Sequence, residues 1–572
     1  MKFLWSYFKK YRLESILAPL FKCLEACFDL AVPVIVAKII DTGIATANKP
    51  YIISRFLLLL AMAVLGLASS CVAQYFAAKA AIGTAAGLRQ DLLCKIQTLS
   101  CGEVDAVGTS TLITRMTSDV NQVQNGLNMF LRLFMRSPFI VFGAMIMAFT
   151  INARLALIFV LAIAVLFFIV FGVMWLSNPL YKKVQQQLDG VTEATREDLN
   201  GVRVIRAFSR EGEQKKRFAA QNGRLLHAQL FVGRVAAVMN PLTYLIVNAV
   251  IIAVLWLGAG KIQNGVLLSG SIIALINYIS QILVELVKLA NLITQLGRSV
   301  ASMNRVGQVL SLQSGMQFGG ESQPQAGAPA VQFNNVSFCY NGSAEPALQN
   351  ISFTAQKGQT IGVIGGTGSG KTTLAHLILR FYDATGGTVL VNGVPVQSLS
   401  KQQLQQAVSA VLQRPRLFSG TVKSNLQLAA PQATEQQMLW VLRLARAEDF
   451  VLEKGGLNAA VEQDGANFSG GQRQRLTIAR ALLCGAKIII LDDSLSALDF
   501  ATDAAVRRAL KTLPKDVTVF FISQRVGSIA GADRILVLDD GALVGSGTHS
   551  ELLQSCSVYR EIFESQTKGA KA

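Results

Sequence analysis

The chain has 572 residues, a formal net charge of +18, 51% hydrophobic residues and a mean hydropathy of +0.42. These values exclude an ordinary soluble protein, and the length is sufficient for two or more domains. Lys and Arg accumulate on the cytoplasmic loops of membrane proteins, so the positive charge requires no nucleic-acid partner and none is expected.

The N-terminal half contains six segments long enough to cross a bilayer, at about 20 residues each. They lie near residues 15–40, 55–78, 128–151, 155–178, 235–259 and 268–292. The connections near 79–127 and 179–234 are long and polar, and the second is strongly basic, which places both on the cytoplasmic side. The sequence therefore predicts an all-α, six-helix transmembrane domain over residues 1–310, in the cytoplasmic (inner) membrane of a cell.

Charged residues interrupt the first and the last of these spans. Lys22, Glu25 and Asp29 lie in the first, and Glu285 and Lys288 lie in the last. A charge at membrane depth is costly and indicates a cavity or a partner. A structural ion pair or a position at the membrane surface explains the same residues, and the sequence leaves these explanations open.

The segment 311–330 is rich in Gly, Gln, Ser and Pro and is interpreted as a linker. From residue 331 to residue 572, short β-like runs alternate with helical segments, as in α/β domains. The eight cysteines are scattered without a metal-binding spacing, so we expect free thiols.

A phosphate-binding motif lies near the start of this second domain. It follows the apolar run 360–364 and precedes a helical stretch, which is the context that such a loop requires. The expected nucleotide ligands are Gly365, Gly366, Thr367, Gly368, Ser369, Gly370, Lys371, Thr372 and Thr373. Lys371 is expected to reach the β- and γ-phosphates, while Thr372 and Asp492, at the end of the apolar strand 488–491, are expected to hold Mg²⁺. The sequence thus predicts an α/β P-loop NTPase domain that binds ATP.

A second motif, with Phe468 followed by Ser469, Gly470, Gly471 and Gln472, is similar to the L-S-G-G-Q signature of ATP-binding-cassette (ABC) proteins. Nearly the whole chain resembles half-size exporters of this family, in which a six-span membrane domain precedes the ATPase domain. The resemblance implies that residues 469–472 bind ATP held by a second subunit, so that each site needs two chains.

The same resemblance assigns further positions. It implies that Tyr340 stacks on adenine, that Gln413 senses the γ-phosphate and approaches the metal, and that residues 496–499 form the loop that follows the catalytic strand.

Two positions depart from the family pattern: Asp493 stands where Glu is usual, and Gln524 stands where His is usual. The shorter side chain draws the carboxylate back by roughly 1.5 Å, one C–C bond. A general base works only within hydrogen-bond reach of its water, so we expect a site that turns ATP over slowly. The alternative is that Asp493 and Gln524 still hydrolyse ATP adequately. Together with Gln413 they are the expected catalytic residues.

Two cytoplasmic segments resemble the family's docking loops. Residues 197–208 resemble the second loop, with a short helix expected near 208–217, and residues 102–110 lie in the first loop. The resemblance implies that both dock on the ATPase domain of the partner subunit, whereas the alternative for each is a solvated helix.

These observations predict export of lipophilic or drug-like compounds by a heterodimer in a lipid bilayer. With its signature intact and its own site altered, the chain resembles the degenerate half of heterodimeric bacterial multidrug exporters. Two alternatives remain, a dedicated lipid or peptide exporter and a regulatory or channel-like subunit that binds ATP without pumping.

Overall fold

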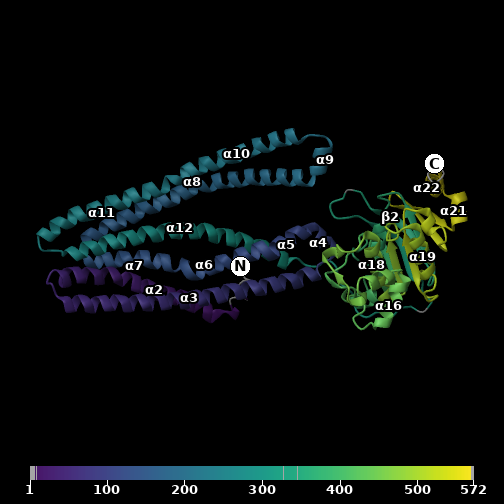
Figure 1. Cartoon of the computed structure of the whole chain (residues 1–572), viewed down its shortest axis with the longest axis horizontal. Helices are drawn as coiled ribbons and strands as arrows, with labels where there is room; N and C mark the ends of the chain where they lie inside the picture. Colours follow the sequence, from purple (N-terminus) through teal and green to yellow (C-terminus); the bar gives the residue numbers. More distant parts are fainter. Residues whose placement is uncertain (1–6, 8, 326, 344, 569–572) are drawn as a thin grey trace. The chain divides into compact units, whose positions relative to one another are not determined.

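The computed structural model describes residues 7, 9–325, 327–343 and 345–568. The chain divides into two compact units (Figure 1). The transmembrane unit comprises Met1–Gln97 and Ser110–Leu312, and the ATPase unit comprises Thr98–Thr109 and Gln313–Ala572. The short segment Thr98–Thr109 therefore packs with the C-terminal residues, although it precedes the predicted linker by some 200 positions.

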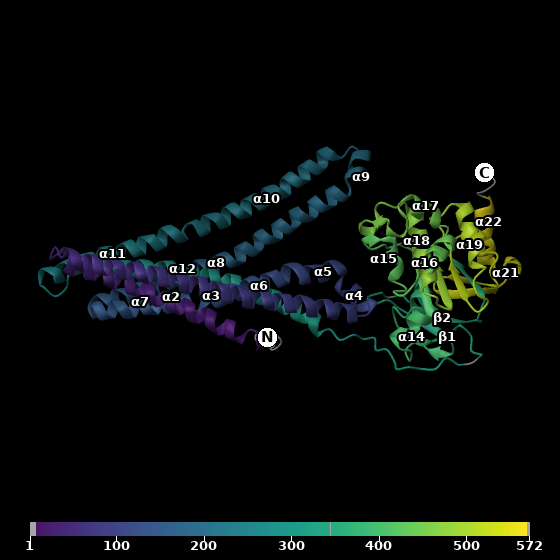
Figure 2. The same ribbon diagram turned by 60° about the horizontal axis from the view of Figure 1, so that its bottom comes forward.

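The transmembrane unit is built of long helices that run alongside one another (Figures 1 and 2). They are α2 (Arg12–Lys38), α3 (Lys49–Thr98), α5 (Thr109–Thr114), α6 (Val120–Met129), α7 (Arg136–Ile151), α8 (Ala153–Asn200), α9 (Val202–Ala207), α10 (Glu211–Ala237), α11 (Met239–Gln263) and α12 (Ser269–Ser311). Short π-helical turns at Ile39–Ile44, Arg115–Asp119 and Phe130–Phe134 interrupt or extend them.

Five helical segments among the described residues are long and apolar enough to cross a membrane. They are Lys49–Thr98, Thr109–Ile151, Ala153–Asn200, Glu211–Gln263 and Ser269–Ser311, and each contains one predicted span. The first predicted span coincides with α2, which is helical but carries Lys22, Glu25 and Asp29. A membrane helix is thus supported for five of the six predicted spans, while α2 as a sixth span stays a prediction.

Local sequence explains how these helices turn and pack. Asn152 adopts an extended conformation between α7 and α8, and its side chain accepts a hydrogen bond from the Leu155 N–H (3.2 Å), so it caps α8. On α12 the fully buried residues Leu275, Tyr278, Ile279 and Ile282 follow helical spacing and form one apolar face. That face places α12 in the centre of the unit, against α2, α7, α8 and α11.

The ATPase unit contains a six-stranded sheet in the order β12-β11-β3-β10-β9-β6. All neighbours in it are parallel except β12, which runs antiparallel to β11. Its strands are β3 (Thr360–Gly365), β6 (Val408–Val411), β9 (Ile488–Asp492), β10 (Thr518–Ile522), β11 (Arg534–Asp539) and β12 (Ala542–Gly547). An antiparallel sheet holds β1 (Val331–Phe338), β2 (Leu348–Ala355), β4 (Gly386–Val391) and β5 (Val394–Pro395), and a short pair holds β7 (Gly420–Thr421) and β8 (Ala460–Val461).

Helices complete the ATPase unit. They are α4 (Cys101–Val107), α13 (Lys371–Ile378), α14 (Lys401–Ala407), α15 (Val422–Gln427), α16 (Glu435–Leu444), α17 (Glu448–Glu453), α18 (Gly470–Leu483), α19 (Phe500–Leu510), α20 (Val526–Ile529), α21 (His549–Ser555) and α22 (Ser557–Lys568).

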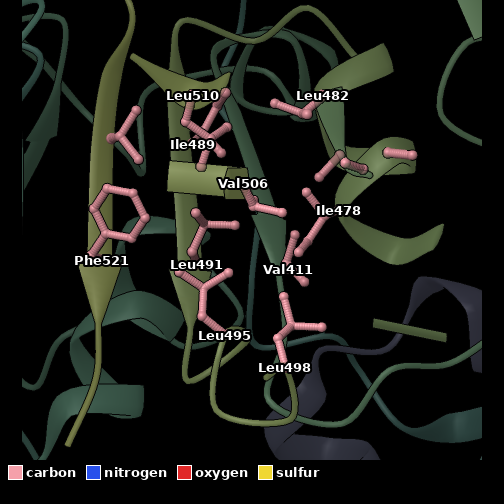
Figure 3. Close-up of a cluster of buried hydrophobic side chains, with 14 of the residues drawn as sticks. Val411, Ile478, Leu482, Ile489, Leu491, Leu495, Leu498, Val506, Leu510 and Phe521 are labelled. Carbon is pink, nitrogen blue, oxygen red and sulfur yellow. The ribbon is translucent and has the colours of Figure 1, made fainter. Parts of the chain in front are cut away.

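The central strands β9 and β10 are buried along their length and mostly apolar, because both faces of the sheet are covered. On one face, Ile489, Leu491 and Phe521 meet side chains of α18 and α19 (Figure 3). On the other face, Ile490 and Phe520 join a cluster that includes residues of α13. Parallel strands end at one common edge, so the residues that follow β3, β9 and β10 are brought together there.

The predicted fold class is confirmed. A helical transmembrane domain precedes an α/β domain whose β3–loop–α13 segment has the P-loop arrangement.

Candidate ATP site

The phosphate loop connects the end of β3 with the start of α13. Gly368 (φ 85°) and Gly370 (φ 92°) adopt left-handed conformations that other residues rarely accept. A Cβ atom on Gly370 would also lie 2.5 Å from the Ala347 carbonyl oxygen. These two glycines are therefore required for the turn that brings backbone and a helix N-terminus together, an arrangement that binds phosphate.

The Lys371 ammonium folds over this loop. Its Nζ donates to the carbonyl oxygens of Gly366 (2.5 Å) and Gly365 (3.1 Å) and to the Ser369 hydroxyl (3.3 Å). Burial lowers the pKa of Lys371, while the nearby carboxylates of Asp492 and Asp493 act in the opposite direction. The ammonium is thus held at the place where a phosphate would sit.

Asp492 has the properties of a metal ligand. It is 2% exposed, the Thr372 hydroxyl donates to its Oδ1 (3.3 Å), and its Oδ2 is buried without a hydrogen-bond partner within the described part of the chain. Burial raises the pKa of Asp492 to about 6; Asp493 adds to this effect and the Thr372 hydrogen bond opposes it. An orphaned carboxylate oxygen beside a hydroxyl is a donor set that fits Mg²⁺, for which Thr372 and Asp492 would be ligands.

A cavity of about 360 Å³ brings most of the predicted site residues together. Tyr340, Thr367, Gly368, Gly370, Lys371, Thr372, Thr373, Gln413, Asp492, Asp493 and Gln524 line it. These residues come from five separate stretches of sequence, so the fold alone creates this grouping. Gly365, Gly366 and Ser369 belong to the same loop and contact Lys371.

Tyr340 is held in place by neighbours on two sides. Its hydroxyl and the Thr373 hydroxyl are 3.1 Å apart, and its ring makes edge contacts with Phe338 (4.8 Å between centroids) and Tyr382 (5.2 Å). Sequence reasoning missed Tyr382, because a single tyrosine after α13 belongs to no recognisable pattern. Tyr382 in turn donates a hydrogen bond to Asp105 of α4, within the same unit.

Asp493 and Gln524 follow the adjacent parallel strands β9 and β10. Asp493 has a φ of 44°, unusual for a residue with a side chain, and its N–H donates to the Ile522 carbonyl (2.8 Å). The Gln524 carbonyl accepts a hydrogen bond from Gln566 of α22 (2.7 Å). Gln566 was not predicted, since it lies 42 residues along the chain and carries no motif.

The structure does not bring the signature residues Ser469–Gln472 to this cavity. Ser469 caps α18: its hydroxyl accepts from the Gln472 N–H (3.3 Å) and the Gln472 side chain accepts from the Ser469 N–H (3.0 Å). Phe468 is buried next to Phe450, which explains why an aromatic residue serves where Leu is usual. Nothing lies within 4 Å of a Cβ placed on Gly470, so this helix start has open space on one side.

One prediction about the docking segments needs correction. The short helix of the second loop is α9 at Val202–Ala207, and α10 already begins at Glu211, so no separate short helix spans 208–217. The first-loop helix α4 packs within this chain's own ATPase unit, where Glu103 accepts a hydrogen bond from the Gly315 N–H (2.6 Å). Docking of either segment on a partner subunit stays a prediction.

The charges in the predicted spans form one ion-pair network in the transmembrane unit. Arg136 at the start of α7, which the sequence did not single out, contacts Asp29 (2.8 Å) and Glu285 (2.9 Å). Lys22 pairs with Glu25 (2.5 Å) and Lys288 pairs with Glu285 (3.0 Å). Of the explanations left open by the sequence, the ion pair is the one that these contacts support.

Comparison with known proteins identifies the family. The ABC transporter transmembrane region matches residues 15–286 and the ABC transporter ATPase family matches residues 348–496. An uncharacterized ABC transporter ATP-binding protein of Mycobacterium tuberculosis is 35% identical over 571 residues, covering 99% of this chain and 98% of that protein. An ATP-dependent lipid A-core flippase of Vibrio vulnificus is 28% identical over 567 residues, covering 99% of this chain and 97% of that protein.

A solved structure has the same fold. A bacterial Atm1-family ABC exporter with ATP bound superposes with a TM-score of 0.80 at 21% identity, over 98% of both chains. Three findings agree: the two family models match in the expected order, the relatives align over nearly the whole chain, and a solved exporter has the same fold. The chain belongs to the ABC transporter family and is a half-size ABC exporter, an ATP-hydrolysing membrane transporter with its transmembrane region ahead of its ATPase domain.

Proposed function

We propose that this chain is the degenerate-site half of a heterodimeric exporter in the cytoplasmic (inner) membrane. The observation that carries the proposal is the position of Asp493 and Gln524 in the same cavity as Lys371 and Asp492. Asp493 replaces the Glu that ordinarily polarises the attacking water, and Gln524 replaces the His that ordinarily contacts the γ-phosphate. This site therefore holds ATP with Mg²⁺ and hydrolyses it slowly.

The intact signature gives the chain a second role. Ser469 and Gly470 are exposed at the start of a long helix, and this helix N-terminus completes the ATP site on a partner half-transporter. The partner would supply the working Glu and His. Turnover in the heterodimer then takes place mainly on the partner's phosphate loop.

The transported compounds are proposed to be lipophilic or drug-like. A dedicated lipid exporter is the second candidate, favoured by the similarity to a protein described as a lipid A-core flippase. A regulatory or channel-like subunit would instead show nucleotide-dependent current without uphill transport.

The test is ATP turnover of the purified full chain, alone and together with the half-transporter that co-purifies with it. We expect slow turnover from the chain alone and a rise of about tenfold or more with the partner, a bound set below the roughly 10²–10⁴-fold that a positioned general base contributes. Equal rates would refute the heterodimer. Uptake of a substrate panel into inverted vesicles then separates drug-like from lipid substrates.

A further inference from the structure

A second cavity lies within the transmembrane unit. It has a volume of about 460 Å³ and is lined by α8, the junction of α10 and α11, and α12. This volume falls within the range of small-molecule sites, about 300–1,000 Å³. The cavity shares no residue with the ATP site.

One wall of this cavity is polar. Asn291, Gln295 and Arg298 are spaced four and three residues apart on α12, so they lie on one helix face. Ser177 and Asn178 face them from α8. Ser177 is 5% exposed, and its hydroxyl is buried without a hydrogen-bond partner within the described ranges. A buried hydroxyl without a hydrogen-bond partner costs folding free energy, and a ligand that forms a hydrogen bond with it would remove that cost.

No negatively charged side chain in the cavity lining balances its one positive charge. Arg298 is the one charged side chain among the residues that line the cavity, and no carboxylate is among them. No ion pair or hydrogen bond joins the Arg298 side chain to any other residue that the structure describes. The lining thus carries one free guanidinium, a group suited to bidentate recognition of carboxylate or phosphate.

The remaining wall is apolar, with Val173 and Met174 on α8 and Met239 on α11. Methionine is flexible and packs against ligands of varied shape. The lining therefore combines one positive end with an adaptable hydrophobic surface.

The position along the helices places the cavity near the inner membrane surface. Ser177 lies 24 residues after the start of α8 at Ala153, or about 36 Å along the axis. Arg298 lies 29 residues after the start of α12 at Ser269, or about 44 Å. Since the hydrocarbon core is about 30 Å thick, both residues lie at the level of the inner headgroups, where an amphiphile presents its charged end.

We propose that this cavity binds an anionic amphiphile, with its carboxylate or phosphate on Arg298 and hydrogen bonds from Ser177, Asn178 and Gln295. The proposal rests on the proposed export function and specifies the substrate class. The acyl or alkyl part lies against Val173, Met174 and Met239. Cationic amphiphiles are disfavoured because the lining offers them no counter-charge.

The test is equilibrium binding of radiolabelled laurate to the purified full chain. Dodecyltrimethylammonium is the comparison ligand with a similar tail and the opposite charge, and acetate and dodecyl phosphate are competitors. We expect laurate to bind, dodecyl phosphate to compete, and acetate and the cation to compete poorly. Arg298→Gln should weaken laurate binding about tenfold or more, whereas Arg298→Lys should retain part of the affinity.

Two further variants test whether a loss of laurate binding comes from a change in the cavity itself. Ser177→Ala should weaken laurate binding several-fold without a change of fold, because it removes a hydroxyl that has no hydrogen-bond partner among the residues that the structure describes. Arg224→Gln, on the exposed face of α10, makes the same charge change and should leave binding unaltered. Unchanged laurate affinity in Arg298→Gln, or equal binding of the cation, would overturn the proposal.

The two proposals fail separately. If laurate binding depends on Arg298 but vesicles export no compound, the site stands and the export function is refuted. If vesicles export compounds but Arg298→Gln binds laurate as tightly as the natural protein, export stands and the anion site is refuted.

Discussion

The backbone N–H of Asp493 donates a hydrogen bond to the carbonyl oxygen of Ile522 (2.8 Å). This bond joins the ends of β9 and β10, the strands followed by the two residues that depart from the ABC pattern. Asp493 and Gln524 are consequently neighbours in one cavity, where the proposed function has both act on the same phosphate. Their effects on turnover should be coupled, because residues in one site are rarely additive.

The first prediction concerns these two residues. Asp493→Glu combined with Gln524→His should raise ATP turnover of the full chain by about tenfold or more, since the longer carboxylate regains the water and the imidazole regains the γ-phosphate. Steady-state phosphate release measures the change. Each single variant should give less than half of the double variant's gain on a logarithmic scale, and Asp493→Asn should lower the residual rate further. If the double variant shows no gain, the slow step lies elsewhere than at this cavity.

The second prediction separates the two ATP sites of the heterodimer. Gly471→Glu puts a bulky negative group where backbone would approach the partner's phosphate, so most turnover should be lost while nucleotide stays bound at Lys371. Lys371→Ala should do the reverse, with weaker nucleotide retention and a smaller loss of turnover.

Bound nucleotide and steady-state hydrolysis are measured on the same heterodimer preparations. Gly531→Glu serves as a matched control, because it makes the same change at an exposed position outside both motifs where a Cβ meets nothing within 4 Å. A larger loss of turnover from Lys371→Ala than from Gly471→Glu would mean that this chain's own site is the working one.

The third prediction concerns the pH dependence of stability. His376 on α13 packs beside Phe381 and Tyr382, and its Nδ1 is buried without a partner among the residues that the structure describes. Burial lowers the pKa of His376 below 6.5, and Asp105 opposes the shift. The unfolded chain therefore binds this proton more readily, and the stability contributed by neutral His376 is lost as pH falls below about 6.5.

His376→Phe removes this dependence. The Tm of the variant minus the Tm of the natural protein should increase as pH falls from about 7.5 to 5.5. Asp492, whose pKa is raised to about 6, acts in the opposite direction but is present in both proteins, so it cancels in the difference. His227→Phe, at an exposed position on α10, is the matched control for the same exchange away from α13.

The fourth prediction concerns the ion-pair network of the transmembrane unit. Glu285 is 4% exposed, and Arg136→Ala removes its guanidinium partner, which should destabilise the unit by about 3–5 kcal/mol. Adding Glu285→Gln to Arg136→Ala should recover part of that loss, because the uncompensated charge is then gone.

Thermal unfolding of the full chain in detergent measures the effect. Arg224→Ala, which removes an exposed arginine on α10 that has no ion pair within the described ranges, is the control. A double variant less stable than Arg136→Ala would show that Glu285 is stabilised sufficiently by Ser137 and Lys288 alone.

The sequence by itself determined those features that are encoded by residues close together in the chain. The spans, the phosphate loop, the signature and the departures at Asp493 and Gln524 are each contiguous in the chain, so hydropathy and short motifs reveal them. The first span is predicted less clearly than the others, because the charged residues Lys22, Glu25 and Asp29 lower the hydropathy of that segment.

Tertiary structure alone decided the contacts between distant residues. Arg136 forms a hydrogen bond with Glu285, which lies 149 positions away in the sequence. Gln566 donates a hydrogen bond to the Gln524 carbonyl, 42 positions away. Tyr382 donates a hydrogen bond to Asp105, 277 positions away. None of these pairs has a pattern along the chain, because a charge or a hydroxyl reveals its partner only when helices and strands pack. The anion cavity at Arg298 is of the same kind: an exposed arginine on α12 becomes a site only where α8 and α11 close around it.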